Sequence, residues 1–262
     1  MSGAGRTDDG HGRLGDRLSG LAVAVGCVLF LGGFVWGAVL YQPYTVPTDS
    51  MAPTVGAGDR VLAQRIDGAE VRRGDVVVFT DAVWGDVPMV KRVVGVGGDK
   101  VTCCDQDGRL TVNGDPVEEP YLRAKGPASP TGFKATVPGD QLFLLGDHRD
   151  TSQDSRVHLA DGDKGSVPRG SVNARVDAIA WPLGNFGLTD RPASFESLPG
   201  GVSQPGPLRL IFVSVVLGAL LILGGAAYGP IARRRAGRRG AGRGGGRAQD
   251  GSPVRERGAA GG

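Results

Sequence analysis

Two long uncharged runs enclose a central region in which short apolar runs alternate with turn-forming residues. Residues 18–48 carry no charge, and residues 21–41 reach the roughly 20 apolar positions that span a bilayer core. A second run, residues 210–228, is of similar length. Between them, β-branched runs alternate with Gly, Asp and Pro, a pattern typical of short strands and turns. This pattern predicts a mainly β domain of short antiparallel strands, flanked by two transmembrane α-helices.

Each uncharged run has a simpler alternative. A cleaved secretory signal is disfavoured for the first run, because the run exceeds the usual apolar length of ~7–15 residues. It also ends in Trp36 and Tyr41 rather than at a clear Ala-x-Ala cleavage site. A buried core helix is the alternative for the second run. Its length, its glycines and the arginine cluster after it favour a membrane span.

The changes of pattern also predict how the chain is organised. Asp107-Gly108 and Asn113-Gly114 are typical hairpin turn pairs, so residues 100–122 are predicted as a hairpin excursion from the main sheet. In chain order we expect a flexible cytoplasmic N-terminus (1–17), a transmembrane helix (18–41), an extracytoplasmic β domain (42–189), a linker rich in Pro, Gly and Ser (190–207), a second transmembrane helix (208–229) and a basic disordered cytoplasmic tail (230–262).

Charge is distributed unevenly along the chain and predicts its orientation. The net charge of +3 combines 0 in residues 1–20, −5 in residues 41–207, +1 from Arg209 and +7 in residues 231–262. Arginines precede the first run and follow the second, whereas none follows the first run before Arg60. The positive-inside rule then predicts a two-span protein of the cell membrane with both termini cytoplasmic. The basic tail could bind RNA, but beside a span it is more simply a topology anchor attracted to anionic lipid.

Cysteine and histidine content excludes several kinds of site. Cys27 lies in the first apolar run and Cys103 and Cys104 are adjacent, so no long-range disulfide can form within the soluble part. A vicinal disulfide, two free thiols and contact with the membrane surface all remain open for the adjacent pair. Three histidines are too few for a zinc site built on several His ligands, and no nucleophile elbow or phosphate-binding loop is present.

The segment YTVPTDSMAPTV, residues 44–55, follows the first span closely and carries a candidate nucleophile. Pro47 and Pro53 act as rigid brackets, and the hydroxyls of Thr48 and Ser50 point the same way if the chain is extended. The alternative is a plain linker, which is what most Ser/Thr/Pro segments after a span are.

The segment DVPMVKRVVGV, residues 86–96, places two adjacent cations in an apolar strand. Alternation puts Met89, Lys91 and Val93 on one face and Val90, Arg92 and Val94 on the other. An arginine keeps its proton in a protein, whereas a lysine desolvated among apolar groups can become a neutral base. Lys91 is therefore the candidate base, and a lysine snorkelling from an edge strand is the alternative.

A third segment, GDHRDTSQDSR at residues 146–156, is dense in short polar side chains. It follows the apolar run QLFLL, and in an extended chain Ser152, Asp154 and Arg156 lie on one side. The alternative is a turn stabilised by an Asp/Arg ion pair, an interpretation that suits Asp154 and Arg156 even if the segment belongs to an active site.

Together these segments resemble the motifs of type I signal peptidases. VPTDSMAPT, RGDVVVF, VKRVVGVGGDKV and LGDHRDTSQDSR occur in the order and approximate spacing of that family, over residues 44–182. The resemblance implies a membrane-bound serine endopeptidase that removes N-terminal signal peptides from exported precursors after small residues, in an Ala-x-Ala pattern. It implies no metal or cofactor. The implied partners are the precursors, the lipid bilayer and, transiently, the secretion translocon, and they include no nucleic acid.

The resemblance also implies a role for individual residues. Ser50 matches the nucleophile and Lys91 the general base of a Ser/Lys dyad. Thr48 matches a hydroxyl that joins the Ser50 backbone N–H in an oxyanion hole, and Ser152 matches a serine that orients the lysine. The remaining matches are a structural ion pair, Asp154 and Arg156, and the small substrate pockets, lined by Val46, Pro47, Met51, Met89 and Val90.

Three other functions remain as alternatives. The first is a catalytically silent, membrane-tethered binding module on the same β scaffold. The second is an esterase with a Ser/His/Asp triad that uses His148 or His158. The third is a self-cleaving Ser/Lys regulator, which is disfavoured because both ends are anchored on the cytoplasmic side and no nucleic-acid-binding domain is present. The sequence departs from the family at His148, where an Asn is more usual.

Overall fold

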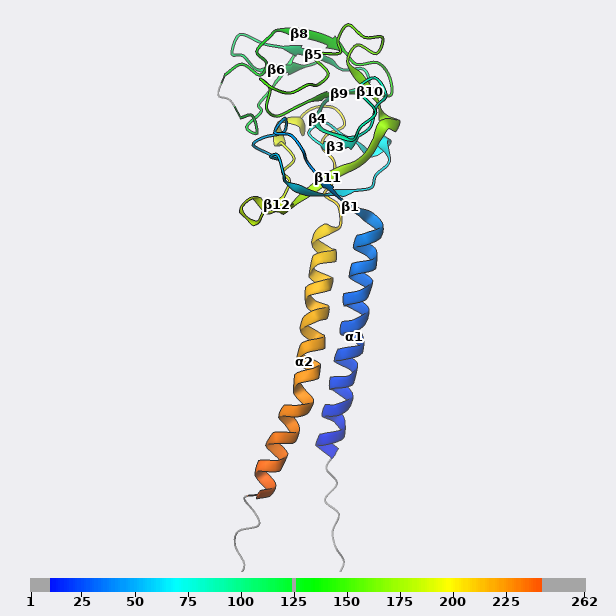
Figure 1. Cartoon of the computed structure of the whole chain (residues 1–262), viewed down its shortest axis with the longest axis vertical. Helices are drawn as coiled ribbons and strands as arrows, with labels where there is room; N and C mark the ends of the chain where they lie inside the picture. The colour runs from blue at the N-terminus through cyan, green and yellow to red at the C-terminus, as the bar shows by residue number, and fades with distance from the viewer. Residues whose placement is uncertain (1–9, 124–125, 242–262) are drawn as a thin grey trace, which may run out of the picture. The chain divides into compact units, whose positions relative to one another are not determined.

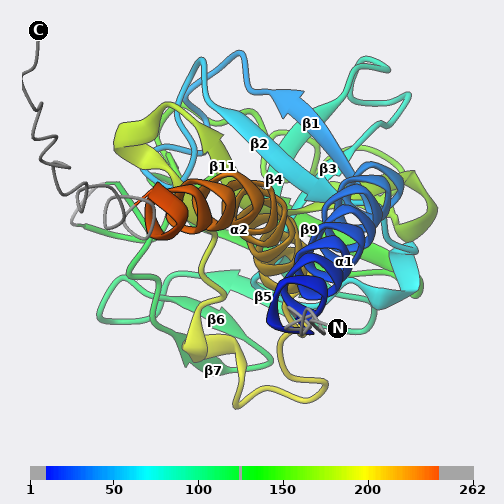
Figure 2. The same ribbon diagram turned by 90° about the horizontal axis from the view of Figure 1, so that it is seen from below.

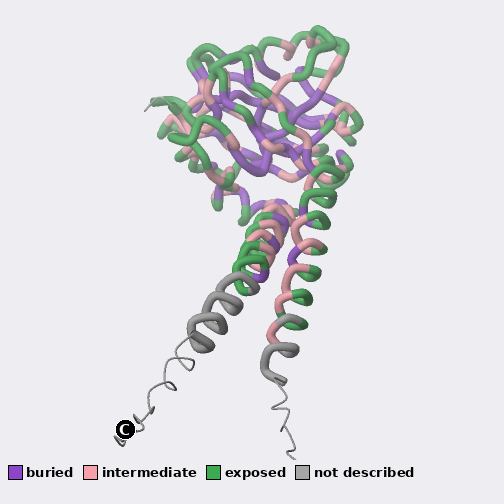
Figure 3. The backbone as a smooth tube through the Cα atoms, turned by 60° about the horizontal axis from the view of Figure 1, so that its bottom comes forward, coloured by how far each residue is buried: buried purple, intermediate pink, exposed green. Residues whose placement is uncertain are grey.

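The computed structural model describes residues 10–123 and 126–241, which form two compact units. One unit holds residues 34–212. The other comprises the helical segments up to residue 33 and from residue 213 onward. Buried residues are concentrated in the first unit, whereas the helix residues whose burial is described are mostly half-buried or exposed (Figure 3).

The two helices run antiparallel (Figure 1) and are longer than predicted. The first, α1, spans Gly10–Leu40, and the second, α2, spans Leu208–Ala241. Within them, Arg17–Leu40 and Leu208–Tyr228 are long and apolar enough to cross a membrane. The tail predicted as disordered from residue 230 is helical to Ala241, because its Ala and Arg residues favour helix. Residues 1–9 and 242–262 of the predicted termini lie outside the described residues.

Small residues bring the two helix backbones close together. A Cβ added to Gly26 would lie 2.8 Å from the Gly218 carbonyl oxygen, and one added to Gly218 would lie 2.6 Å from the Phe30 nitrogen. The Ser19 hydroxyl donates a 2.7 Å hydrogen bond to the Gly225 carbonyl oxygen. Gly26 follows Ser19 by seven residues and Gly225 follows Gly218 by seven, the spacing of a left-handed helix pair in which small side chains permit close backbone packing.

The larger unit consists of two antiparallel sheets, which confirms the predicted mainly β fold. The main sheet has the order β1-β2-β11-β3-β4-β9-β10, with β12 paired to β11, and the smaller sheet has the order β7-β6-β5-β8. In the view from below, β5, β6 and β7 group apart from β1, β2 and β11 (Figure 2). The strands are β1 (Tyr41–Thr45), β2 (Arg60–Gln64), β3 (Val76–Phe79), β4 (Met89–Val96), β5 (Lys100–Cys103), β6 (Leu110–Val112), β7 (Asp115–Val117), β8 (Phe133–Thr136), β9 (Gln141–Leu145), β10 (Ser166–Pro168), β11 (Val172–Trp181) and β12 (Gly187–Leu188).

The centre of the main sheet is buried on both faces. Strand β3 is apolar at every position, and its side chains alternate between two clusters. Val76 and Val78 pack with the nucleophile-candidate segment, whereas Val77 and Phe79 pack with β9 and β10. A continuous apolar strand is expected where both faces are covered. The central strands are therefore fixed from both sides, and β4 is one of them.

The predicted hairpin excursion is larger than residues 100–122. Strand β8 also belongs to this second sheet, because Phe133–Thr136 pairs with β5 over its whole length. The sequence around β8 carries no hairpin signal, since its partner is distant in the chain. Cys103 and Cys104 form a vicinal disulfide in this sheet, and Cys103 is buried in the core.

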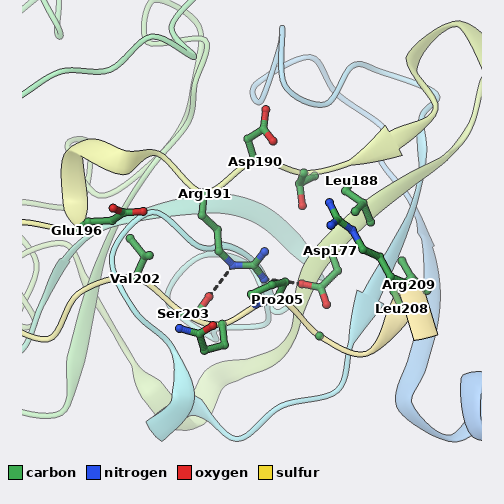
Figure 4. A pocket seen from close by; sticks show the side chains of 13 residues that line it. Asp177, Leu188, Asp190, Arg191, Glu196, Val202, Ser203, Pro205, Leu208 and Arg209 are labelled. Carbon is green, nitrogen blue, oxygen red and sulfur yellow. Dashed lines mark hydrogen bonds and ion pairs between the residues drawn. The ribbon is translucent and has the colours of Figure 1, made fainter. Parts of the chain in front are cut away.

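Residues 190–207, here called the strap, are packed onto the β unit rather than forming a free linker. Phe195 and Leu198 are buried in the same core cluster as the second sheet. Arg191 donates hydrogen bonds to Ser203 Oγ (2.7 Å) and to Asp177 Oδ1 (2.8 Å) on β11, beside a pocket of about 330 Å³ (Figure 4). The linker prediction rested on the Pro, Gly and Ser content of the segment. Composition alone does not reveal that Phe195 and Leu198 anchor it in the core.

Replacing Phe195 by Ala is expected to destabilise the β unit by about 3 to 5 kcal/mol, because it empties a fully buried site. Equilibrium unfolding of the whole chain in detergent, followed by tryptophan fluorescence, measures the change. Phe186→Ala is the matched control, since Phe186 is 63% exposed. Equal destabilisation by the two variants would show that the strap does not contribute to the core.

Candidate active site

The segment that carries Ser50 joins β1 to β2 and is held by buried neighbours. Met51 and Val55 are fully buried, and the Val55 N–H donates a 2.9 Å hydrogen bond to the Met51 carbonyl oxygen. The Val46 N–H donates to the Asp59 carbonyl oxygen (2.9 Å). Thr48 Oγ1 lies 3.4 Å from Ser50 Oγ at the exposed surface of the segment. The backbone around Ser50 is thus fixed while its hydroxyl remains accessible.

Lys91, on β4, reaches the Ser50 hydroxyl. Its Nζ lies 2.9 Å from Ser50 Oγ, although the two residues are 41 positions apart in the sequence. Lys91 is only 5% exposed. Burial lowers the pKa of Lys91 below the ordinary range of lysine, and the nearby carboxylates of Asp154 and Asp147 offset part of that shift. The structure therefore brings the predicted nucleophile and base into hydrogen-bond contact.

The loop after β9, residues 146–156, packs against the nucleophile segment. The His148 N–H donates a 3.0 Å hydrogen bond to the Ser50 carbonyl oxygen. Asp154 accepts a hydrogen bond from the Gly146 N–H (3.0 Å) and pairs with Arg156 at 2.8 Å. The predicted ion pair is thus present in the structure, and it holds the loop whose backbone contacts Ser50.

Ser152 lies in the same loop, and its hydroxyl does not contact Lys91 by a hydrogen bond. Its Oγ is buried and has no hydrogen-bond partner in the described part of the chain. An added Cβ on Gly146 would overlap Ser152 Oγ and would lie 2.6 Å from the Ser50 carbonyl oxygen. Ser152 therefore lies beside the nucleophile segment, separated from it by the width of a glycine.

A buried ion pair next to Lys91 escaped the sequence reasoning. Arg92 donates to Asp147 twice, through Nε (2.8 Å) and Nη2 (2.7 Å), and the two side chains are 1% and 0% exposed. Thr54 Oγ1 donates to the same carboxylate at 2.5 Å. The adjacent cations of β4 were a signal for this pair, because a fully buried arginine requires an acidic partner.

A pocket of about 490 Å³ adjoins Ser50 and Lys91. Four of the five residues predicted to bind substrate line it, namely Val46, Pro47, Met89 and Val90. Met51 does not, since its side chain is fully buried in the core. The sequence reasoning did not assign eight further lining residues to the site: Tyr44, Thr45, Asp49, Val78, Val87, Pro88, Thr151 and Gln153.

The two histidines of the β unit have other partners. His148 Nδ1 lies 2.9 Å from Thr151 Oγ1, and His158 Nδ1 lies 2.8 Å from Asp161 Oδ2. The contacts of Ser50 Oγ are with Thr48 and Lys91. Among the described residues, no group of three or more His, Cys, Asp or Glu side chains is arranged to hold a metal ion.

The family model of "Signal peptidase, peptidase S26" matches residues 18–181, more than half of the chain. The chain belongs to this family. It is therefore a peptidase of the serine class, and family membership together with the two apolar helices indicates association with a membrane. The signal peptidase match spans the first helix, the nucleophile segment, Lys91 and the loop after β9.

Curated signal peptidases I of several bacteria are similar to this chain. The enzyme of Mycobacterium tuberculosis is 31% identical over 240 residues, covering 71% of this chain and 80% of that protein. Signal peptidase IB of Staphylococcus aureus is 30% identical, covering 68% of this chain and 95% of that protein. A crystal structure of a signal peptidase I from Enterococcus faecalis is 28% identical, with a TM-score of 0.33, and covers 40% of this chain and 94% of that one.

Replacing Gly146 by Ala is expected to lower kcat about 10- to 100-fold, because the new methyl group must displace Ser152 and the Ser50 carbonyl. The same overlap should cost about 1 to 3 kcal/mol of stability. Peptide cleavage and thermal unfolding measure the two effects. Gly139→Ala is the control, since nothing lies within 4 Å of a Cβ at that position. Unchanged kcat in Gly146→Ala would contradict the tight packing.

Proposed function

We propose that the chain is a signal peptidase I that cleaves precursors with a Ser50/Lys91 dyad. The single observation that carries this proposal is the 2.9 Å contact between Lys91 Nζ and Ser50 Oγ, in a site where burial lowers the pKa of Lys91. A neutral lysine amine at hydrogen-bond distance can remove the proton from the serine hydroxyl as the hydroxyl attacks. The substrates are precursor proteins that bear N-terminal signal peptides.

Two proton transfers through Lys91 complete the reaction. Ser50 Oγ attacks the scissile carbonyl carbon while its proton passes to Lys91 Nζ. Lys91 then gives that proton to the leaving amine, and the C–N bond breaks to leave an acyl-enzyme. A water attacks the ester and passes a proton to Lys91, which returns a proton to Ser50 Oγ as the signal peptide leaves.

Charge on the tetrahedral intermediate is stabilised by an oxyanion hole formed by the Ser50 backbone N–H and the Thr48 hydroxyl. The position of Thr48 Oγ1, 3.4 Å from Ser50 Oγ, supports this role. Ser152 orients Lys91, and its partner-free buried hydroxyl beside the nucleophile segment is consistent with a contact made during the reaction. Asp154 and Arg156 hold the loop that carries it.

Substrate selection follows from the size of the pocket beside Ser50. Val46, Pro47, Met89 and Val90 narrow it with apolar side chains, so small residues before the cut are accepted and bulky ones are excluded. This supports cleavage after an Ala-x-Ala pattern. Met51 packs in the same buried cluster as Val46, Val78 and Val90, so it supports these pocket residues from the core rather than touching substrate.

The proposed topology places the β unit outside the cytoplasm. Arginines flank the two spans at the N-terminus and after residue 232, and the positive-inside rule puts both ends in the cytoplasm. Precursors emerging from the secretion translocon would then reach Ser50 on the outer side, through a transient contact with the translocon. A catalytically silent binding module is not favoured, because the Ser/Lys contact and the named relatives both point to a peptidase.

Replacing Ser50 or Lys91 by Ala should each abolish precursor cleavage, with losses on the order of 10³-fold or more. Lys91→Arg should be equally inactive, because an arginine retains the charge but cannot release its proton. Cleavage of a purified precursor by the chain in detergent, scored by gel shift, measures the loss. His148→Ala should retain most of the cleavage. Activity that survives Lys91→Ala but not His148→Ala would favour the esterase alternative.

The pH profile provides an independent test. Only the neutral form of Lys91 can accept the Ser50 proton, so kcat/KM should rise as pH increases through the pKa of Lys91. Because burial lowers that pKa, the rise should occur at lower pH than for an ordinary lysine. Initial rates between pH 5 and 10 on one peptide measure it. A rate independent of pH across that range would contradict a lysine base.

A further inference from the structure

The loop between β3 and β4, residues 80–88, borders the pocket and is held by hydrogen bonds to Asp81 and by the packing of one large side chain, Trp84. Its residues 82, 83 and 85–88 are exposed, whereas Trp84 is half-buried. The loop ends at Val87 and Pro88, which line the pocket next to Ser50 and Lys91. Trp84 is therefore one of the anchors that set the position of this pocket wall.

Trp84 packs between two rings. The Phe79 ring meets it edge to face, with centroids 5.3 Å apart and an interplanar angle of 83°. The imidazole of His158 stacks on it, with centroids 4.6 Å apart and an angle of 19°. Phe79 is a buried residue of β3, so it supplies a fixed base. His158 covers the other side of the Trp84 ring and comes from a different part of the chain.

His158 belongs to the turn that continues the loop after β9. The Val157 N–H donates to the Asp154 carbonyl oxygen (3.0 Å), and the His158 N–H donates to the Ser155 carbonyl oxygen (3.3 Å). Thr151 and Gln153, a few residues before this turn, line the same pocket. The ring contact therefore joins two loops that each contribute to the pocket.

We propose that Trp84 and His158 form a clasp that holds these two pocket walls at the spacing the substrate peptide requires, which makes both of them positioning residues. The inference rests on the proposed function, because it takes the pocket as the peptide site. Neither ring lines the pocket, so the clasp acts through Val87 and Pro88 on one side and Gln153 on the other. Its loss should weaken peptide binding and leave the Ser50/Lys91 contact intact.

His158→Ala and Trp84→Ala should each raise KM for a signal-peptide substrate about 2- to 10-fold, the effect of losing one aromatic contact, with kcat changed less than twofold. Steady-state cleavage of one peptide by the full chain in detergent separates the two constants. His158→Phe, which keeps a ring against Trp84, should restore KM. Asp161→Asn is the matched control, since it removes the carboxylate beside His158 and leaves the stack.

The double variant Trp84→Ala with His158→Ala should raise KM no more than the worse single variant, because the two residues share one contact. An unchanged KM in His158→Ala, or no rescue by His158→Phe, would overturn the clasp while the peptidase function stands. Thermal unfolding shows whether the Trp84→Ala variant is still folded. If it is not, the KM of His158→Ala alone tests the clasp. Cleavage that survives Lys91→Ala would instead overturn the proposed function.

Discussion

The Arg92–Asp147 ion pair fixes the geometry on which the rest of the site depends. It is bidentate, almost fully buried, and connects β4 to the loop after β9. Thr54 joins the same carboxylate from the nucleophile segment. Three segments that are distant in sequence thus meet at one pair of charges. Removing either partner would leave an uncompensated buried charge, which is among the most costly changes a protein core can undergo.

This pair also explains how two adjacent basic residues on β4 can differ in the pKa shifts that their surroundings cause. Arg92 forms a bidentate ion pair with the Asp147 carboxylate and stays charged. Lys91 is also buried, but the carboxylates of Asp147 and Asp154 near it are already engaged, Asp147 by Arg92 and Asp154 by Arg156. Desolvation therefore dominates at Lys91 and lowers its pKa. The ion pairs that engage the neighbouring acids therefore support the proposed base alongside the burial of the lysine itself.

The sequence was most informative for features that depend on residues close together in the chain. Uncharged length predicted the two helices, and alternation on β4 correctly separated Met89 and Val93 from Val90, which pack in different clusters. The family resemblance directed attention to Ser50 and Lys91, whose contact periodicity alone could not predict. Features that depend on distant partners were missed, including the pairing of β8 with β5, the Arg92–Asp147 pair and the ring contact of Trp84 with His158.

The position of β11 has a consequence for how the molecule matures. This strand lies between β2 and β3 in the main sheet, although it follows both by about a hundred residues in the chain. The core is then completed by Phe195 and Leu198, beyond residue 181, where the family match ends. A ribosome must therefore make nearly the whole β unit before its sheet can close. During synthesis, Ser50 and Lys91 therefore cannot stand in a completed core until the chain has been made almost as far as α2.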